Sequence, residues 1–206
     1  NPNATDRVSV AMDYMYRNKT LKDYFYAGDS GAGYINPNQL YGSRSPSGYP
    51  SGVEIWQNHC KKYYRLFDYS ISGWLLNGAS ALTATDTANY APFSGDGIGV
   101  YLGTPSMYLV SNCPVNTMKG DLGLGGTGTV MDYPSGANFG WYRTIIWFPQ
   151  DVKNLQNRYA NSEHNHQFLD AYTFYYLMRY YLGGTNNYRA TWVSDTIPRI
   201  MAAGET

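Results

Sequence analysis

Apolar residues recur at the spacing of one helix face in three segments of the chain, and this pattern predicts a helix in each. The first segment covers residues 6–18, and Thr5 or Asp6 can cap its start. Its apolar face consists of Val8, Ala11, Met12, Met15 and Tyr16. The second segment begins where Ser51 and Glu54 have the spacing of a capping box. Its apolar stripe consists of Val53, Trp56, Cys60, Tyr63, Tyr64 and Phe67.

The third segment covers residues 170–182 and ends at Gly183 and Gly184, because glycine is a common residue just past a helix. Its apolar stripe consists of Ala171, Phe174, Tyr175, Met178 and Tyr181. Two shorter helices are expected over 85–90 and 150–159.

Short apolar runs between these helices predict the strands of a sheet. Residues 24–27 form an aromatic run, and residues 69–76 are apolar without alternation, which is typical of an interior strand. Further strands are expected at 97–102, 107–110, 141–148 and 191–194. Because helices and strands alternate, we predict an α/β fold with a largely parallel sheet and flanking helices.

About five or six strands are too few for a complete eight-stranded barrel, which takes about 250 residues. The 206 residues therefore predict one α/β domain over 1–206, either as part of a (β/α) barrel or as a small open sheet. Loops are expected over 36–50, over the glycine-rich stretch 120–128, and around Cys113, which precedes a proline.

The charge balance argues against nucleic acid as a partner. Fifteen basic and fifteen acidic residues cancel, and charged residues make up only 15% of the chain. A protein that binds polyanions by releasing counterions needs a basic surface, and no basic run is present. No apolar stretch approaches the roughly 20 residues of a membrane-spanning helix.

The chain is unusually rich in tyrosine, with 22 Tyr among 206 residues. Tyrosine combines an apolar ring with a polar tip, which suits sugar-binding surfaces as well as ordinary α/β cores and subunit contacts. We expect most of the tyrosines to pack in the core and a few to face a ligand. A disulfide between Cys60 and Cys113 is left open by the sequence.

Residues 28–37 concentrate the chemistry of the chain. Asp29 and Ser30 follow the expected strand 24–27, and Gly31 and Gly33 lie directly after them. Two glycines around one small residue indicate close approach of the backbone to another group. In alternating strand–helix folds ligands bind at the carboxyl ends of the strands, so this loop is a candidate site.

The same loop carries a family resemblance. Residues 31–37 read Gly-Ala-Gly-Tyr-Ile-Asn-Pro, which fits a Gly-x-Gly-Tyr-x-x-Pro signature, with Asn36 where the stricter form has Tyr. The chain thus resembles the C-terminal domain of the GxGYxYP family of bacterial putative glycoside hydrolases, over roughly residues 6–78. The resemblance implies carbohydrate chemistry and a larger protein with an upstream region. With the sparse lysine and abundant Tyr, Asn and Gly, it implies an extracellular or cell-surface location.

Hydrolysis of a glycosidic bond usually takes two carboxyl groups, one as proton donor and one as nucleophile or base. The catalytic candidates are Asp29 after the first strand, Asp96 in a Gly-Asp-Gly turn, and Glu163 in a polar loop. Each has a structural alternative. Asp29 can bind turn amides, Asp96 can be an ordinary turn residue, and Glu163 can be a solvated loop residue.

The substrate-binding candidates are Ser30, Gly31, Gly33, Tyr34 and Trp74. Tyr34 can stack on a sugar, orient a carboxylate through its hydroxyl or pack the loop, and Trp74, near the end of its strand, can face a ligand or lie in the core. His164 and His166 offer two imidazoles without a third ligand, which favours a surface pair over a metal site. No cofactor is expected, and the lack of a phosphate-loop motif gives nucleotide binding no support. The lack of a Gly-x-Ser-x-Gly elbow disfavours a lipase-type nucleophile.

Three functions remain open from the sequence. The first is a glycoside hydrolase-like domain that acts on or binds a polysaccharide through the signature loop and a Tyr-rich cleft. The second is a glycan-binding domain without catalysis. The third is a structural surface protein that self-assembles into homo-oligomers, because interfaces are enriched in Tyr and Met.

Overall fold

The computed structural model describes residues 7–42, 48–101, 106–118, 139–140, 147–159 and 168–185. Its centre is one open four-stranded sheet with the order β1-β2-β4-β3. The strands are β1 (Ile71–Leu75), β2 (Gly97–Val100), β3 (Met107–Val110) and β4 (Cys113–Thr117). Strands β1, β2 and β4 run parallel, and β3 pairs antiparallel with β4. The predicted α/β class with a largely parallel sheet is therefore confirmed, and the described strands form an open sheet rather than a barrel.

The helices lie close to the segments where the sequence predicts them, although the apolar face expected over 6–18 is buried only at Met12. They are α2 (Ser9–Asn18), α3 (Val53–Leu66), α4 (Ala84–Tyr90), α5 (Pro149–Tyr159) and α6 (Ala171–Tyr181), with a short 3-10 turn η1 (Pro37–Gln39) in the signature loop. The stripe of α3 is confirmed at Trp56, Cys60 and Tyr64, which are buried. Gly183, with a φ of 74°, follows α6 as expected.

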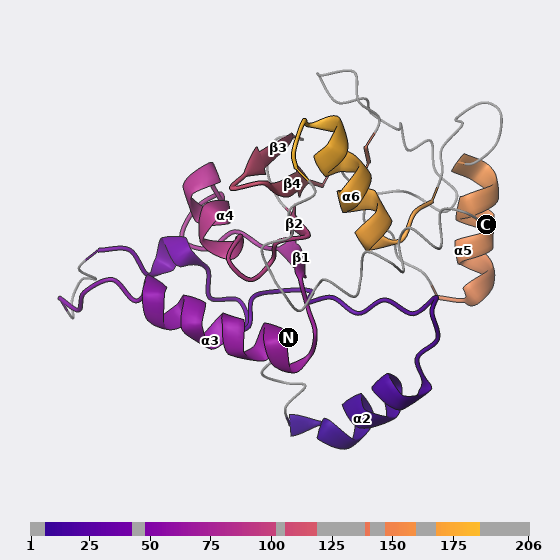
Figure 1. The fold of residues 1–206 in the computed structure, drawn as a ribbon, viewed down its shortest axis with the longest axis horizontal. Coiled ribbons are helices and arrows are strands. Elements are labelled where there is room, and N and C mark those ends of the chain that lie inside the picture. Colours follow the sequence, from indigo (N-terminus) through magenta and orange to yellow (C-terminus); the bar gives the residue numbers. More distant parts are fainter. Residues whose placement is uncertain are drawn as a thin grey trace.

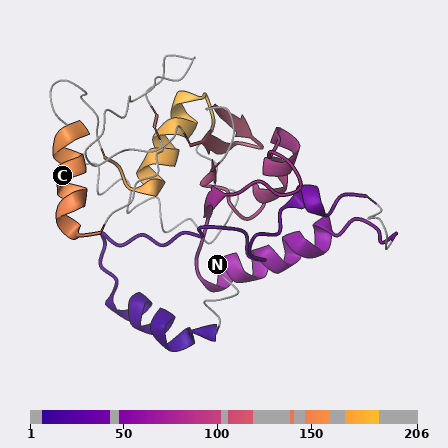
Figure 2. The same ribbon diagram turned by 180° about the vertical axis from the view of Figure 1, so that it is seen from behind.

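Helices cover both faces of the sheet (Figures 1 and 2). Buried residues of α3 and α4 form one hydrophobic cluster with Leu75, Ile98 and Val115. Buried residues of α6 form a second cluster with Ile71. Successive residues of a strand point to opposite faces, so the two clusters define an α3 face and an α6 face of the sheet.

A glycine allows α6 to approach the sheet closely. A Cβ atom on Gly97 would lie 2.3 Å from the Tyr175 ring, so only glycine leaves room for that ring against β2. Tyr175 and Met178 of the predicted α6 stripe are buried, whereas Tyr181 is exposed. The buried face of the helix is therefore rotated from the predicted stripe toward Tyr172 and Arg179, which are also buried.

Several local expectations are wrong. The N-cap of α2 is Val8, which makes no side-chain capping bond, rather than Thr5 or Asp6. The expected strand 24–27 is reduced to one parallel bridge between Ala27 and Ser72. The N-cap of α3 is Gly52, which has no side chain to cap the helix, so the Ser51 capping box does not form. Cys113 begins β4 rather than lying in a loop. Pro114 is tolerated there because it precedes Val115, where pairing with β2 begins.

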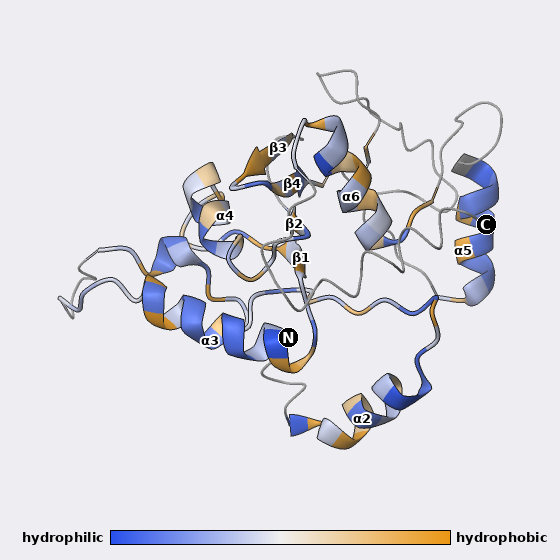
Figure 3. Cartoon of the chain, viewed as in Figure 1, coloured by the Kyte–Doolittle hydropathy of each residue, from blue (hydrophilic) through white to orange (hydrophobic). Residues whose placement is uncertain are grey.

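Some expectations lie outside the described residues. These are the glycine-rich loop 120–128, the strand 191–194 and residues 141–146 of the strand expected over 141–148. Trp147 and Phe148 form a bend that leads into α5 rather than a strand end. Helix α5 is mostly hydrophilic in Figure 3, and its buried apolar residue is Leu155. Within the part that the structure describes, no helix is long and apolar enough to cross a bilayer.

Candidate active site at the carboxyl end of the parallel strands

Asp29 lies just beyond the point where the chain runs alongside β1. The Ala27 amide donates to the Ile71 carbonyl at 3.1 Å, and the Gly73 amide donates to the Ala27 carbonyl at 2.8 Å. These bonds hold residues 26–28 parallel to β1 and direct the following residues toward the carboxyl end of the sheet. The sequence-based placement of Asp29 at a carboxyl strand end therefore holds, although the strand itself is a single bridge.

The Asp29 carboxylate is only 6% exposed. Its Oδ1 accepts a hydrogen bond from the Ser30 amide at 2.7 Å. Burial raises the pKa of Asp29 from 3.8 to about 6, and the Ser30 hydrogen bond opposes this rise. A carboxyl group with such a pKa can exist in either protonation state near neutral pH, as a general acid or base must.

The glycines of the signature loop are explained by close packing and by backbone conformation. A Cβ atom on Gly31 would lie 2.6 Å from the Cα atom of Cys60 in α3. Gly33 has a φ of 73°, and its amide donates to the Ser30 carbonyl at 3.2 Å. The Ser30 hydroxyl donates in turn to the Gly33 carbonyl at 2.6 Å. Ser30, Gly31 and Gly33 thus shape the loop and dock it on α3.

Asn36 holds the end of the signature loop in place through side-chain hydrogen bonds. Its side-chain amide donates to the Leu76 carbonyl at 2.8 Å, and its oxygen accepts a hydrogen bond from the Tyr90 hydroxyl. Asn36 therefore connects the signature loop to the chain after β1 and to the end of α4. Tyr34 is different, because its side chain is 67% exposed. Its position is compatible with a role in contacting a ligand.

Trp74 lies on an irregularity near the end of β1. Ser72 pairs with Ile98 and Leu75 pairs with Val100, so two residues of β1, Gly73 and Trp74, stand opposite one residue of β2. Trp74 has a φ of 69°, which is rare for a residue with a side chain. Bulges of this kind redirect side chains and are common beside active sites.

Two tyrosines that the sequence did not single out lie at this bulge, one against Trp74 and one over Gly73. The rings of Trp74 and Tyr101 lie 4.8 Å apart between centroids, with 32° between their planes. The Tyr26 ring lies over Gly73, because a Cβ atom there would come within 3.0 Å of it. These neighbours come from three separate segments, so only the strand order, which the sequence does not reveal, could have identified them.

Asp96 lies at the opposite, amino end of the sheet. Its amide donates to the Ser70 carbonyl at 3.0 Å, and its carboxylate accepts from the Ser70 hydroxyl at 2.7 Å. Arg179 of α6, only 1% exposed, places a guanidinium nitrogen 3.7 Å from the carboxylate. Burial raises the pKa of Asp96 to about 6, against the opposing effects of Ser70 and Arg179.

The structure therefore does not bring Asp29 and Asp96 to one edge of the sheet. Ser70, which binds Asp96, is three residues before Gly73, which binds Ala27. At about 3.3 Å per residue this separation alone is roughly 10 Å. Catalytic carboxyl pairs of glycosidases lie about 5–9.5 Å apart. Glu163, His164 and His166 lie outside the described residues.

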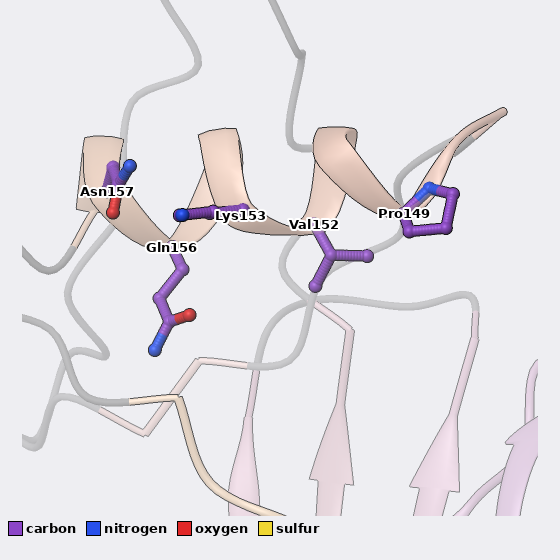
Figure 4. Close-up of a pocket in the computed structure, with 5 residues that line it drawn as sticks. All are labelled: Pro149, Val152, Lys153, Gln156 and Asn157. Carbon is purple, nitrogen blue, oxygen red and sulfur yellow. The ribbon is translucent and has the colours of Figure 1, made fainter.

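Two hollows occur elsewhere on the described surface. One is an open hollow of about 710 Å³ along α5 (Figure 4), lined by Pro149, Val152, Lys153, Gln156 and Asn157. The other is a crevice of about 30 Å³ near the start of β1, lined by Tyr16, Lys19, Thr20, Leu21, Asp23, Tyr24, Phe25, Asp68 and Tyr172. Neither hollow contains a sequence-predicted site residue. Within the described ranges, no group of three or more His, Cys, Asp or Glu residues could hold a metal ion.

Comparison with known protein families agrees with the resemblance seen in the signature loop. The family model described as GxGYxYP putative glycoside hydrolase C-terminal domain matches residues 1–116, from before α2 to β4. Comparisons with curated proteins and with solved structures returned no significant match. Because the family match spans more than half of the 206 residues, the chain belongs to the GxGYxYP putative glycoside hydrolase C-terminal domain family.

Proposed function

We propose that this chain is a carbohydrate-active domain in which the carboxyl end of the parallel sheet faces a polysaccharide and Asp29 donates a proton to the leaving oxygen. The observation that carries the proposal is the position of Asp29. It is a buried carboxyl group two residues before the family signature, at the strand end where α/β enzymes bind ligands. Its raised pKa of about 6 keeps a protonated fraction available near neutral pH.

The second carboxyl group of the reaction has to come from another segment. Asp96 is unsuited to the role, because its carboxylate is bound to Ser70 and Arg179 at the far end of the sheet. Glu163 stays a candidate from the sequence, and an upstream domain of the same precursor is the alternative source. We further propose that the domain works outside the cell, where polymeric glycans are encountered.

The test is Asp29→Asn, assayed on a panel of soluble polysaccharides by release of reducing ends. Loss of a general acid typically lowers the rate by about 100-fold or more. The matched control is Asp13→Asn, which removes the same charge from an exposed residue of α2 and should leave the rate unchanged. Equal rates for the wild type and Asp29→Asn, with both folded, would remove Asp29 from the mechanism.

The pH profile provides a second readout. As general acid, Asp29 works in its protonated form, so kcat/KM should fall as the pH rises through about 6. The same limb should be absent from any residual activity of Asp29→Asn. A profile that is flat between pH 5 and 8 would contradict the assignment.

A second candidate function is glycan binding without hydrolysis. The observation in its favour is the separation of Asp29 from Asp96, which leaves Asp29 without that carboxyl partner at its edge of the sheet. This function predicts that wild type and Asp29→Asn bind the same polysaccharide equally well and that neither releases reducing ends.

A further inference from the structure

We propose that Tyr26, Trp74 and Tyr101 form an aromatic platform that binds the apolar face of a pyranose ring, and that its sugars are glucose- or xylose-based. The three rings belong to three neighbouring parallel segments near the carboxyl end of the sheet. The inference rests on the proposed carbohydrate function and adds a binding subsite that is separate from Asp29.

The bulge in β1 turns the Trp74 side chain to the α6 face of the sheet. Ser72 contacts Tyr64 of α3, and Leu75 belongs to the α3-side core, although the two residues are three positions apart. In a regular strand they would point to opposite faces. Because both point to the α3 face, Gly73 and Trp74 are left for the α6 face of the sheet.

Tyr26 and Tyr101 reach the same face by ordinary strand alternation. Phe25 and Ala27 pack with the α3-side cluster, so Tyr26 between them faces the other way. Ile98 and Val100 also belong to that cluster, which directs Gly99 and Tyr101 to the α6 side. The α6 cluster itself reaches β1 at Ile71, nearer the amino end. The platform therefore lies beyond the sheet area that α6 covers.

The backbone conformation of Trp74 indicates that its side chain does more than pack within the fold. A φ of 69° is unfavourable for a residue with a Cβ atom and is readily adopted by glycine. Gly or Asn would be the natural choice if the bulge served only the fold. Strained positions of this kind persist mainly where the side chain they present is needed.

The chemistry of the platform suits a sugar better than a protein partner. Trp74 and Tyr101 are half-buried and Tyr26 is 48% exposed, so part of each of the three side chains is accessible. Three rings are far smaller than the roughly 800 Å² that each partner buries in a stable protein interface. A glucose or xylose ring has only C–H groups on its faces and hydroxyls around its rim, which matches an aromatic floor with polar edges.

The platform and Asp29 lie on different faces near one end of the sheet. The Asp29 backbone is bound by Tyr64 on the α3 side, whereas the platform faces α6. A polysaccharide that crosses the carboxyl end can contact both, with the platform holding sugars away from the reacting bond. The platform should therefore control binding of long chains and not the chemical step.

The test compares Trp74→Gly and Tyr101→Ala with the wild type by affinity electrophoresis in soluble β-glucan, xylan and galactomannan. Trp74→Gly removes the ring and relieves the positive φ, so it should fold, and Tyr101→Ala provides an independent variant. We expect each to bind β-glucan or xylan about tenfold more weakly. The matched control is Tyr14→Ala on α2, which removes an exposed tyrosine from elsewhere and should bind like the wild type.

The outcomes separate the platform from the proposed catalysis. Weaker binding by the platform variants with full binding by Asp29→Asn supports the platform, whether or not hydrolysis is seen. Wild-type binding that survives both platform variants overturns the platform and leaves the carbohydrate function standing. A wild type that binds none of the polysaccharides, or prefers galactomannan, overturns the platform as stated, and complete absence of binding and hydrolysis overturns the carbohydrate function as well.

Discussion

The two ends of the parallel sheet each bury an aspartate, and the two aspartates have opposite surroundings. Asp29 at the carboxyl end accepts a hydrogen bond from a neutral amide of its own loop. Asp96 at the amino end faces the guanidinium of Arg179, which also donates to the Asn112 and Gly95 carbonyls. Burial raises the pKa of both to about 6. Burial and pKa alone therefore do not distinguish a reactive carboxyl group from a structural one.

The difference lies in what happens when the carboxylate loses its charge. Arg179 is buried, so it depends on Asp96 for a counter-charge. The Asp96 charge is therefore part of the docking of α6 against the sheet. On α3, the groups that interact with Asp29 are the Tyr64 hydroxyl and the Cys60 thiol, and neither is a cation. Loss of the Asp29 charge therefore leaves neither of these two groups without a counter-charge.

The largest expected effect is at the amino end. Arg179→Met leaves the Asp96 carboxylate buried without its cation, and Asp96→Asn leaves Arg179 without its anion. Each should lower the free energy of unfolding by about 3–5 kcal/mol at pH 7, measured by urea denaturation. The double variant should regain part of the loss. Full stability in Arg179→Met would show that the ion pair does not hold α6.

Asp29→Asn should behave in the opposite way in the same experiment. Its raised pKa means that the folded protein holds the Asp29 proton more tightly than the unfolded chain does. The stability from this proton is present below about pH 4 and is lost as the pH rises through about 6. At pH 7 the neutral asparagine should therefore be as stable as the wild type or more stable. A destabilisation equal to that of Asp96→Asn would erase the distinction between the two ends.

The next effect concerns the loop that carries Asp29. Gly31→Ala would place a methyl group 2.6 Å from the Cys60 backbone, so the loop must move off α3. We expect a loss of about 2–3 kcal/mol in urea denaturation, as for other overpacked sites. Gly28→Ala is the control three residues earlier, where a Cβ atom meets nothing within 4 Å. Equal stability of the two variants would contradict the close packing of the loop.

Much of the scaffold could be predicted from the sequence, because it follows from local periodicity. The stripe of Trp56, Cys60 and Tyr64 predicts α3, and the apolar run before Asn77 predicts β1. The apolar stripe of α6 and the glycine that follows it likewise predict this helix and its end. Strand β4 was missed, since Pro114 suggests a loop and its place beside the β2 pairing becomes clear only in the fold.

The candidate site was less accessible to sequence reasoning. The position of Asp29 followed from its neighbours in the chain, but the partners of the other site residues are distant in sequence. Arg179 lies 83 positions from Asp96 and occupies a helix whose visible signal is apolar. The bulge that turns Trp74 toward Tyr101 depends on pairing register, which no local pattern reveals.

The smallest effect tests whether the two ends are coupled. The Tyr64 hydroxyl donates to the Asp29 carbonyl at 2.9 Å and bonds Ser72, whose hydroxyl bonds Ser94, two residues before Asp96. Tyr64→Phe should cost about 1 kcal/mol, because Ser72 keeps Ser94 as a partner. In a double-mutant cycle with Ser94→Ala, a coupling energy above about 0.5 kcal/mol would show that the hydroxyls act as one network. Strict additivity would mean that the carboxyl and amino ends of the sheet are energetically independent, so that the reactive and structural aspartates could be altered separately.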